Sequence, residues 1–180
     1  VSGGLHGVGA SVVNALSSHL IVEVKQDGQF YRQEYSKGIP KYDVKKTKDS
    51  ILNMPFENGT AVSFLPDTEI FKATIELDYN KFKKQINEKA YLIPKVFFRI
   101  INHVENERTA YYFDGGILSL IRDMNKGKKV LHDPIYMKQS DGDIEVEVAI
   151  QFNDSLMESV NSFVNVINTV EGGTHLTGFR

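Results

Sequence analysis

The chain has no cysteine among its 180 residues, which excludes disulfides and thiolate metal sites and is typical of a cytosolic protein. It also lacks any apolar run near the roughly 18 residues of a transmembrane helix, and its start lacks a signal-peptide pattern. Neither sign of charge dominates, since 21 Lys and Arg stand against 23 Asp and Glu. We therefore expect a cytoplasmic globular protein with no membrane partner, and no DNA-binding surface marked within this stretch.

The ends of the chain do not read as domain boundaries. The first residue is Val1 rather than Met, and the last two, Phe179 and Arg180, are not followed by a polar tail. Domain boundaries usually fall in exposed polar linkers. The sequence therefore predicts a piece of a longer protein, with room for one domain or for one domain and part of another.

A glycine-rich segment near the start is the most informative feature that is present. Four glycines lie within Gly3-Gly4-Leu5-His6-Gly7-Val8-Gly9, directly before the helical pattern that begins at Ala10. Such a loop adopts positive φ values and lets several N–H groups converge on one anion, and the following helix adds its first-turn N–H groups. This arrangement favours the binding of nucleotide phosphates.

The spacing excludes two common phosphate loops. No Lys-Ser or Lys-Thr follows the last glycine, so the segment is not a Walker A loop. Gly4, Gly7 and Gly9 follow the order G-x-x-G-x-G, the reverse of the dinucleotide fingerprint, and no strand precedes them, although Glu23 lies at a suitable distance for a ribose ligand. A third kind of nucleotide site remains, with a flexible glycine-rich connection as the alternative.

The pattern along the chain alternates between helices and strands. We expect an exposed loop over 41–50 and a turn at Asp27-Gly28 between paired strands. Asp78 is a plausible N-cap for the helix that follows it. Residues 144–150 alternate strictly and predict a strand with one buried face. Helices are expected over 10–19, 79–86 and 116–125, and strands over 20–25, 29–35, 60–65, 96–101, 109–113 and 144–150.

Four stretches carry a resemblance to a known family. The segment from Val1 to Gly9 with Ser11 to Ser17 resembles the ATP lid and following helix of the type II topoisomerase B subunits, which comprise the gyrase and ParE branches of the GHKL ATPase superfamily. Asn58-Gly59-Thr60, then 112–117, and then Glu171-Gly172-Gly173-Thr174-His175-Leu176-Thr177-Gly178-Phe179-Arg180 resemble the same subunits in the same order. The resemblance covers essentially the whole chain, and its first and last blocks are the specific ones.

The resemblance implies an α+β fold in two parts. Residues 1–127 are expected to form the C-terminal part of a GHKL (Bergerat) ATPase α/β sandwich, a mixed sheet covered on one face by helices. Residues 128–180 are expected to begin a transducer domain of ribosomal-protein-S5-like α/β fold. The segment 157–167 is ambiguous between helix and strand, and the resemblance favours a strand. In the turn before the last helix, Thr174 is a possible N-cap.

For the site, the resemblance implies ATP with Mg²⁺. Gly3 and Gly4 would let the lid fold over, while Leu5, His6, Gly7, Val8 and Gly9 would donate N–H groups to the β- and γ-phosphates. Thr60 would support the aspartate that binds adenine, although it could also simply open a strand after the Asn58-Gly59 turn. His6 is expected to act through its backbone rather than as an acid or base.

Catalytic residues are expected outside the chain. The resemblance puts the general base, the Mg²⁺ ligand and the adenine-binding aspartate upstream of Val1, and a lysine beyond Arg180. The chain alone is therefore expected to be inactive and to hold no metal ligand. Gln26 stands where gyrase subunits commonly carry an arginine, so sensitivity to coumarin-type inhibitors is in doubt.

The implied parent uses ATP-driven dimer closure to pass one DNA duplex through another. Its expected partners are DNA, the gyrase A subunit and a second copy of the B subunit. The gyrase branch is preferred over the ParE branch. Two rivals remain: another GHKL enzyme, such as a MutL-like repair ATPase or a sensor kinase, and a module that binds a nucleotide without catalysis. Upstream acidic residues would separate catalysis from binding alone.

Overall fold

The computed structural model describes residues 6–54, 57–72 and 75–180, which belong to two compact units divided after residue 76. The first unit comprises residues 4–76 and the second residues 77–180. Gly3, Gly4 and Leu5, three of the predicted site residues, lie outside the described part. The described helices include none with the length and apolar character of a membrane span.

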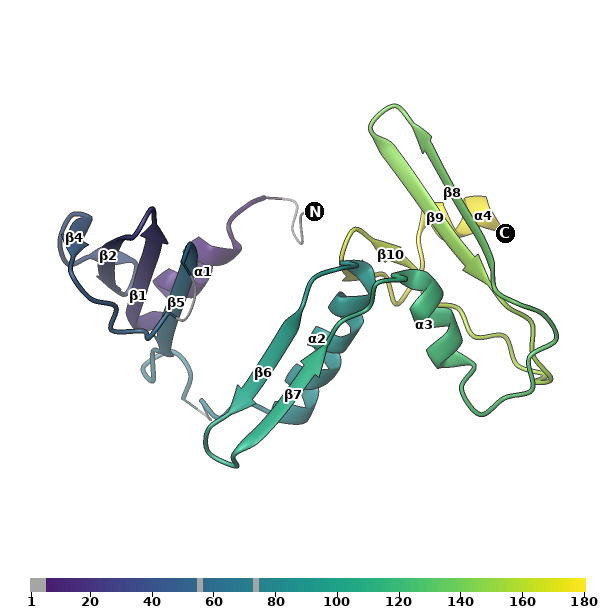
Figure 1. Ribbon diagram of the computed structural model, residues 1–180, viewed down its shortest axis with the longest axis horizontal. Coiled ribbons are helices and arrows are strands. Elements are labelled where there is room, and N and C mark those ends of the chain that lie inside the picture. Colours follow the sequence, from purple (N-terminus) through teal and green to yellow (C-terminus); the bar gives the residue numbers. More distant parts are fainter. Residues whose placement is uncertain (1–5, 55–56, 73–74) are drawn as a thin grey trace. The chain divides into compact units, whose positions relative to one another are not determined.

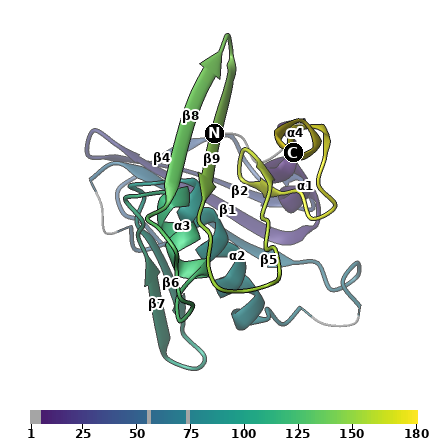
Figure 2. The ribbon, with the colours of Figure 1, turned by 90° about the vertical axis from the view of Figure 1, so that its right-hand side faces the viewer.

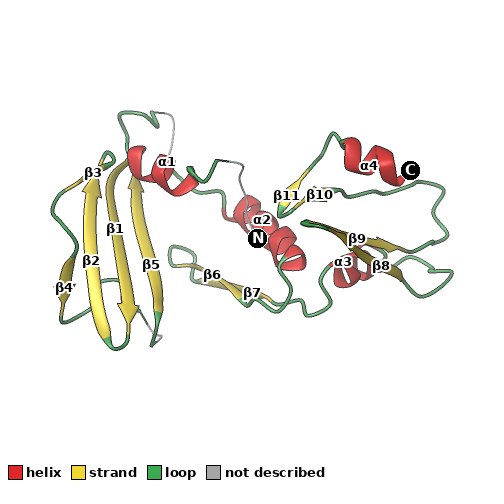
Figure 3. Ribbon diagram, turned by 90° about the horizontal axis from the view of Figure 1, so that it is seen from above, coloured by secondary structure: helices red, strands yellow, loops and turns green. Residues whose placement is uncertain are grey.

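The described part of the first unit is a short helix and one antiparallel sheet of five strands (Figures 1 and 3). Strand order is β3-β2-β1-β5, and β4 pairs with β2 beside β3. The two long central strands are joined by a turn at Asp27 and Gly28, both with positive φ (51° and 76°). Positive φ at both turn residues matches the twist of a hairpin, so the predicted hairpin is confirmed. The elements are α1 (Gly9–Ala15), β1 (Ser17–Gln26), β2 (Gln29–Ser36), β3 (Ile39–Pro40), β4 (Lys45–Thr47) and β5 (Gly59–Pro66).

Helix α1 ends four residues earlier than predicted. The expected helix reached His19, but the chain enters β1 at Ser17. The Ser17 hydroxyl donates to the Val13 carbonyl at 2.6 Å, and the Ser17 carbonyl accepts from Lys37 N–H at 2.8 Å. Pairing with neighbouring strands therefore overrides the local helical pattern, since a buried backbone group in the sheet must find a partner.

The segment 41–50 was predicted to be a loop, but part of it is a strand. Residues Lys45 to Thr47 form β4, with Lys46 opposite Tyr31 and Lys45 opposite Arg32 of β2. The ammonium of Lys46 lies 5.8 Å from the centre of the Tyr31 ring. Lysine has a low strand propensity, but pairing with the edge of β2 and contact with an aromatic face offset it.

The described residues of the second unit form three helices and three separate two-stranded sheets (Figures 1 and 2). The pairs are β6 with β7, β8 with β9, and β10 with β11, all antiparallel. Together with the sheet of the first unit, these elements confirm the expected α+β class. The elements are α2 (Tyr79–Leu92), β6 (Phe98–Asn102), β7 (Glu107–Tyr111), α3 (Ile117–Met124), β8 (Ile135–Asp141), β9 (Ile144–Ile150), β10 (Phe163–Val164), β11 (Ile167–Asn168) and α4 (Thr174–Phe179).

Helix α2 begins where its cap predicts. The Asp78 carboxylate accepts from Lys81 N–H at 3.0 Å, which satisfies a first-turn donor. The helix packs on the β6–β7 hairpin, where Ile100 is buried and the Tyr79 hydroxyl lies 3.3 Å from that of Thr109. Both predicted strands of this hairpin are confirmed with small shifts at their ends.

Strand β9 has its predicted bounds but not its predicted burial. Ile144 and Val146 are 68% and 53% exposed. The alternation does put the apolar side chains on one face of the β8–β9 hairpin, with Met137 opposite Val148. No layer of described residues covers the part of that face near the turn, so the prediction of a buried face is wrong for it.

The last segment combines short strands and a short helix. Within 157–167 the favoured strand is found only at its end, as β10 and the start of β11, while Met157 is 82% exposed. The N-cap of α4 is Gly173, with φ 157°, and not Thr174, which is the first helical residue. Glycine serves there because the chain leaves the turn with positive φ.

Candidate functional site

The described part of the glycine-rich segment leads straight into α1. His6, Gly7, Val8 and Gly9 are all exposed, and α1 begins at Gly9 with Val8 as its N-cap. Valine offers no side-chain capping bond to the first turn. The segment therefore presents backbone rather than side chains.

Among the described residues of this segment, Gly7 is the one whose backbone requires glycine. Its φ is +65°, in the left-handed region, whereas Gly9 has no positive φ. A Cβ added at Gly7 would meet nothing within 4 Å. The constraint is thus conformational and not steric, and an L side chain would cost about 1–2 kcal/mol there.

Thr60 lies at the start of β5, on a face of the sheet that is largely exposed. It stands opposite Val24 of β1, and Val62 stands opposite Val22. Because side chains alternate along a strand, Gln26 shares this face with Val24. We name the residues Val24, Gln26, Thr60 and Val62 the open sheet face. Thr60 is exposed, Val62 is 57% exposed and Val24 is half-buried, so among the described residues the end of this face around Thr60 is accessible to a ligand.

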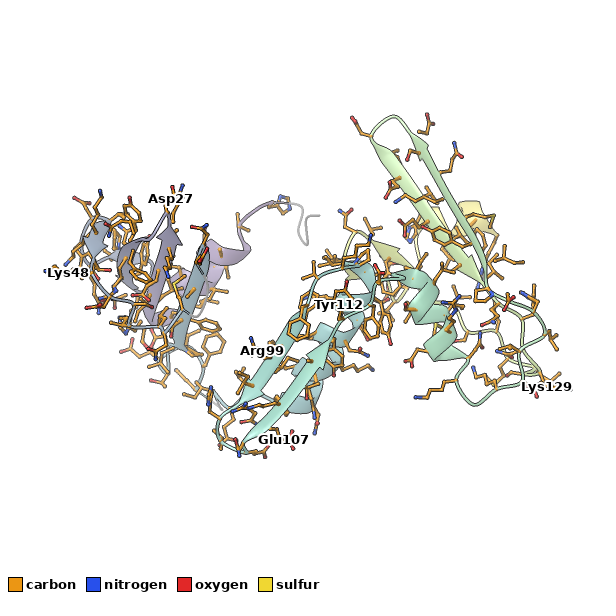
Figure 4. The ribbon with its side chains drawn as sticks, viewed as in Figure 1. Asp27, Lys48, Arg99, Glu107, Tyr112 and Lys129 are labelled. Atoms are coloured by element: carbon orange, nitrogen blue, oxygen red, sulfur yellow. The ribbon has the colours of Figure 1, made fainter. Side chains whose placement is uncertain are left out.

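One hydrogen bond ties the two strand ends of this face together. The side-chain oxygen of Asn58 accepts from the backbone N–H of Asp27 at 2.9 Å. Asp27 is at the tip of the β1–β2 hairpin (Figure 4). This bond holds the turn that follows Gln26 against the residues just before Thr60. Asn58 therefore stabilises the β1–β2 turn through its side chain, in addition to the turn that Asn58-Gly59 was expected to form.

The sequence did not reveal the buried network at Glu23, on the opposite face of the sheet. The Glu23 side chain is fully buried and its carboxylate accepts from Arg32 Nε at 2.7 Å and from the Ser50 hydroxyl at 2.6 Å. It also accepts from the backbone N–H groups of Ile51 and Leu52, both at 3.0 Å. A carboxylate with these partners is a structural anchor, so the spacing that fits a ribose ligand has no functional meaning here.

The electrostatics of Glu23 follow from these partners. Burial alone raises the pKa of a carboxyl group, but the bonds from Ser50, Ile51, Leu52 and Arg32 stabilise the charged form and lower the pKa of Glu23 to about 2. The charged carboxylate fixes the segment 50–52 to β1. Glu23 itself pairs with Ala61 of β5, the strand that carries Thr60.

The described histidines lie apart from one another, each with its own surroundings. Across the described ranges, no cluster of three His, Cys, Asp or Glu side chains could hold a metal ion. His6 is exposed on the loop. His175 Nε2 lies 3.2 Å from the Thr169 hydroxyl, and His132 Nε2 accepts from Phe152 N–H at 3.0 Å.

Comparisons with known proteins agree on one family. The family model described as DNA gyrase B matches residues 116–180. The chain is 43% identical over 180 residues to the DNA gyrase B protein of Archaeoglobus fulgidus, a match that covers all of this chain and 28% of that protein.

Two solved structures are similar to the chain. The 43K ATPase domain of Thermus thermophilus gyrase B, in complex with an aminocoumarin, has a TM-score of 0.84 and 31% identity over 97% of this chain and 47% of its own. The topoisomerase IV ATP-binding domain of Francisella tularensis, in complex with a small-molecule inhibitor, has a TM-score of 0.73 and 28% identity over 99% of this chain and 47% of its own. The chain thus spans about half of each solved domain and less than a third of the curated relative.

Proposed function

The chain belongs to the DNA gyrase B family, and we propose that it forms the phosphate-lid half of the ATP site in the ATP-binding polypeptide of a type II topoisomerase. The observation that carries the proposal is the exposed loop from His6 to Gly9, with its positive φ at Gly7, which leads directly into α1. A backbone that is bare of side chains suits the close approach of phosphate oxygens.

The residues present fit part of a nucleotide. The backbone of Gly3, Gly4, Leu5, His6, Gly7, Val8 and Gly9 would hold the phosphates. On the open sheet face, the valine side chains offer an apolar surface to a base, and Thr60 offers a hydroxyl beside it. When bound, ATP supplies phosphoanhydride hydrolysis as the source of free energy for the parent enzyme.

The residues of this chain bind and orient rather than transfer protons. The lid backbone places dipoles toward the phosphate charge, which is most effective once lid closure excludes water. The general base, the Mg²⁺ ligand and the catalytic lysine are proposed to come from parts of the protein outside Val1–Arg180. The division into a GHKL part over 1–127 and a transducer part from 128 remains part of this proposal.

The parent would pass one DNA duplex through another, with the A-type gyrase polypeptide and a second copy of its own chain as partners. We favour gyrase over the decatenating ParE branch. The relatives from Archaeoglobus fulgidus and Thermotoga maritima both carry the gyrase name, and each match covers this whole chain, at 43% and 40% identity.

The test uses the full-length protein assembled with its A-type partner on relaxed closed-circular DNA. With ATP, the enzyme is expected to introduce negative supercoils. With a non-hydrolysable ATP analogue and a limiting amount of enzyme relative to DNA, no supercoiling is expected. Decatenation without supercoiling would assign the ParE branch. Nucleotide binding without hydrolysis and without any change in DNA topology would contradict the proposed topoisomerase activity. It would favour a module that binds a nucleotide without catalysis.

A further inference from the structure

The N-terminal end of helix α3 is fixed to helix α2. The Tyr91 ring on α2 stacks on Phe113, which precedes α3, with ring centres 3.7 Å apart, and only 4% of Tyr91 is exposed. Burial, with the nearby Asp123 carboxylate of α3 as the second cause, raises the pKa of Tyr91 to about 12. The Gly116 backbone, with φ +54°, lies against the Tyr91 carbonyl, 3.6 Å from where a Cβ would stand.

The C-terminal end of α3 is fixed to the segment that follows β9 by three amide side chains. Asn125, the C-cap of α3, is only 7% exposed. Its side-chain N–H₂ donates to Gln151 Oε1 at 2.8 Å, and its oxygen accepts from Asn153 Nδ2 at 2.6 Å. Gln151 in turn donates to the His132 carbonyl at 2.9 Å. The amide nitrogen and the amide oxygen of Asn125 are therefore both hydrogen-bonded, and neither group is charged.

The amide cluster lies at the base of the β8–β9 hairpin. Leu131 N–H donates to the Phe152 carbonyl at 3.0 Å, and Asp154 N–H donates to the Lys129 carbonyl at 3.0 Å. Figure 4 marks Lys129 in the loop that follows α3. The segment after α3 and the segment after β9 are therefore held side by side, and Asn125 joins them to the end of the helix.

We propose that α3 is a strut between α2 and the β8–β9 hairpin, and that Asn125 is the positioning residue that sets the direction of the hairpin. The inference deepens the proposed function and rests on it, since the strut would carry movement of the ATP-binding part to the part that acts on DNA. Asn125 touches no nucleotide or DNA in this account; it acts through Gln151 and Asn153.

Amides suit this role because their hydrogen bonds are directional and their loss is costly when buried. A buried donor or acceptor left without a partner costs more than the bond contributes on average. A tilt of the hairpin relative to α3 would break two such bonds at once. The joint therefore has one favoured geometry and resists intermediate ones.

The test uses the full-length protein with its A-type partner and compares three variants. Asn125→Asp keeps the shape but puts an acceptor opposite Gln151 Oε1. Adding Gln151→Lys to that variant restores a donor. Asn102→Ala is the control, because the Asn102 side-chain oxygen likewise accepts a hydrogen bond, from Val104 N–H at 3.0 Å, but lies at the tip of the β6–β7 hairpin. The readouts are supercoils introduced per ATP hydrolysed and the affinity for ATP.

The strut predicts a selective loss of coupling. In Asn125→Asp, supercoils per ATP should fall about tenfold, the equivalent of one unsatisfied buried group, while the affinity for ATP stays within a factor of about two. The double variant should recover most of the loss, and the control should match the wild type.

Two results would overturn the strut. One is unchanged coupling in Asn125→Asp. The other is an equal fall in ATP affinity and coupling that Gln151→Lys does not restore, because this is the result of a purely structural role. Failure of the proposed function is a separate result, since the wild-type enzyme itself would then show no ATP-dependent change in DNA topology.

Discussion

The two units of this chain use charge in opposite ways. In the first, Glu23 is wholly buried and its four hydrogen-bond donors connect β1, β2 and the segment 50–52. In the second, Lys138 bridges Glu145 and Glu147 across the β8–β9 hairpin at 2.8 Å, but all three side chains are substantially exposed. The geometry is equally good in both places, and only the surroundings differ.

The difference shows where a contact matters. A buried charge that loses its partner is left without water, whereas an exposed one is solvated again and was screened from the start. The first unit should therefore respond sharply to changes at Glu23, and the second should barely respond to changes at Lys138. In the second unit, apolar side chains such as Leu156 and Met157 are also left exposed.

The largest effect is expected for Glu23→Ala. It leaves the Arg32 guanidinium, the Ser50 hydroxyl and two backbone N–H groups without their common acceptor, which should cost about 3–5 kcal/mol. Hydrogen exchange of the Ile51 and Leu52 amides in the full-length protein should then accelerate about a hundredfold or more. Unchanged protection of these two amides would contradict the anchor role of Glu23.

Acid should reproduce this effect in part. The pKa of Glu23 is lowered from 4.5 to about 2 in the folded state. The charged carboxylate therefore adds about 3 kcal/mol to the free energy of unfolding. This contribution is complete above pH 4.5 and is lost as the pH falls toward 2. Exchange of the same amides, corrected for the intrinsic pH dependence, should follow this course in the wild type. Glu23→Gln, which does not titrate, should show no such loss.

A smaller effect, about tenfold in affinity, is expected on the open sheet face for Gln26→Arg. The guanidinium adds a charge and a planar fork of donors at the strand end where the family resemblance implies coumarin contact. Titration of the full-length protein with an aminocoumarin should therefore show tighter binding than the wild type. Equal affinity would mean that this strand end does not contact the inhibitor.

The smallest effect is expected for Glu145→Ala on the exposed hairpin. The hydrogen bonds that Lys138 donates to Glu145 and Glu147 raise the pKa of Lys138 above its ordinary value. All three groups lie in water, however, and Glu147 still accepts from the ammonium at 2.8 Å when Glu145 is removed. Hydrogen exchange of β8 and β9 should stay unchanged. A loss of protection comparable to that of Glu23→Ala would remove the contrast between the two units.

Local pattern predicted the elements whose signals are local. The turn at Asp27-Gly28, the Asp78 cap of α2 and the bounds of β9 each depend on neighbouring residues, and each is confirmed, although the expected burial of one face of β9 is not. The early end of α1 and the strand β4 depend on pairing with distant strands, so the sequence could not reveal them.

The site was predictable only in part for the same reason. The glycine segment is contiguous, and its need for glycine at Gly7 follows from the backbone. The sequence offered Glu23 only as a residue at a suitable distance for a ribose ligand, because its actual partners lie 9 to 29 residues away. The Asn125 cluster likewise joins residues 26 and 28 positions apart, which no local spacing indicates.

The central claim is that the glycine segment closes on nucleotide phosphates, and the affinity of the full-length protein for ATP tests it most directly. Gly7→Ala should lower the affinity about tenfold, because the bound lid needs a left-handed φ that alanine resists. Gly142→Ala is the matched control, since Gly142 has φ +57° and open space in the turn between β8 and β9. Loss of affinity in Gly7→Ala alone is the predicted result, and equal affinities in both variants and the wild type would contradict the account.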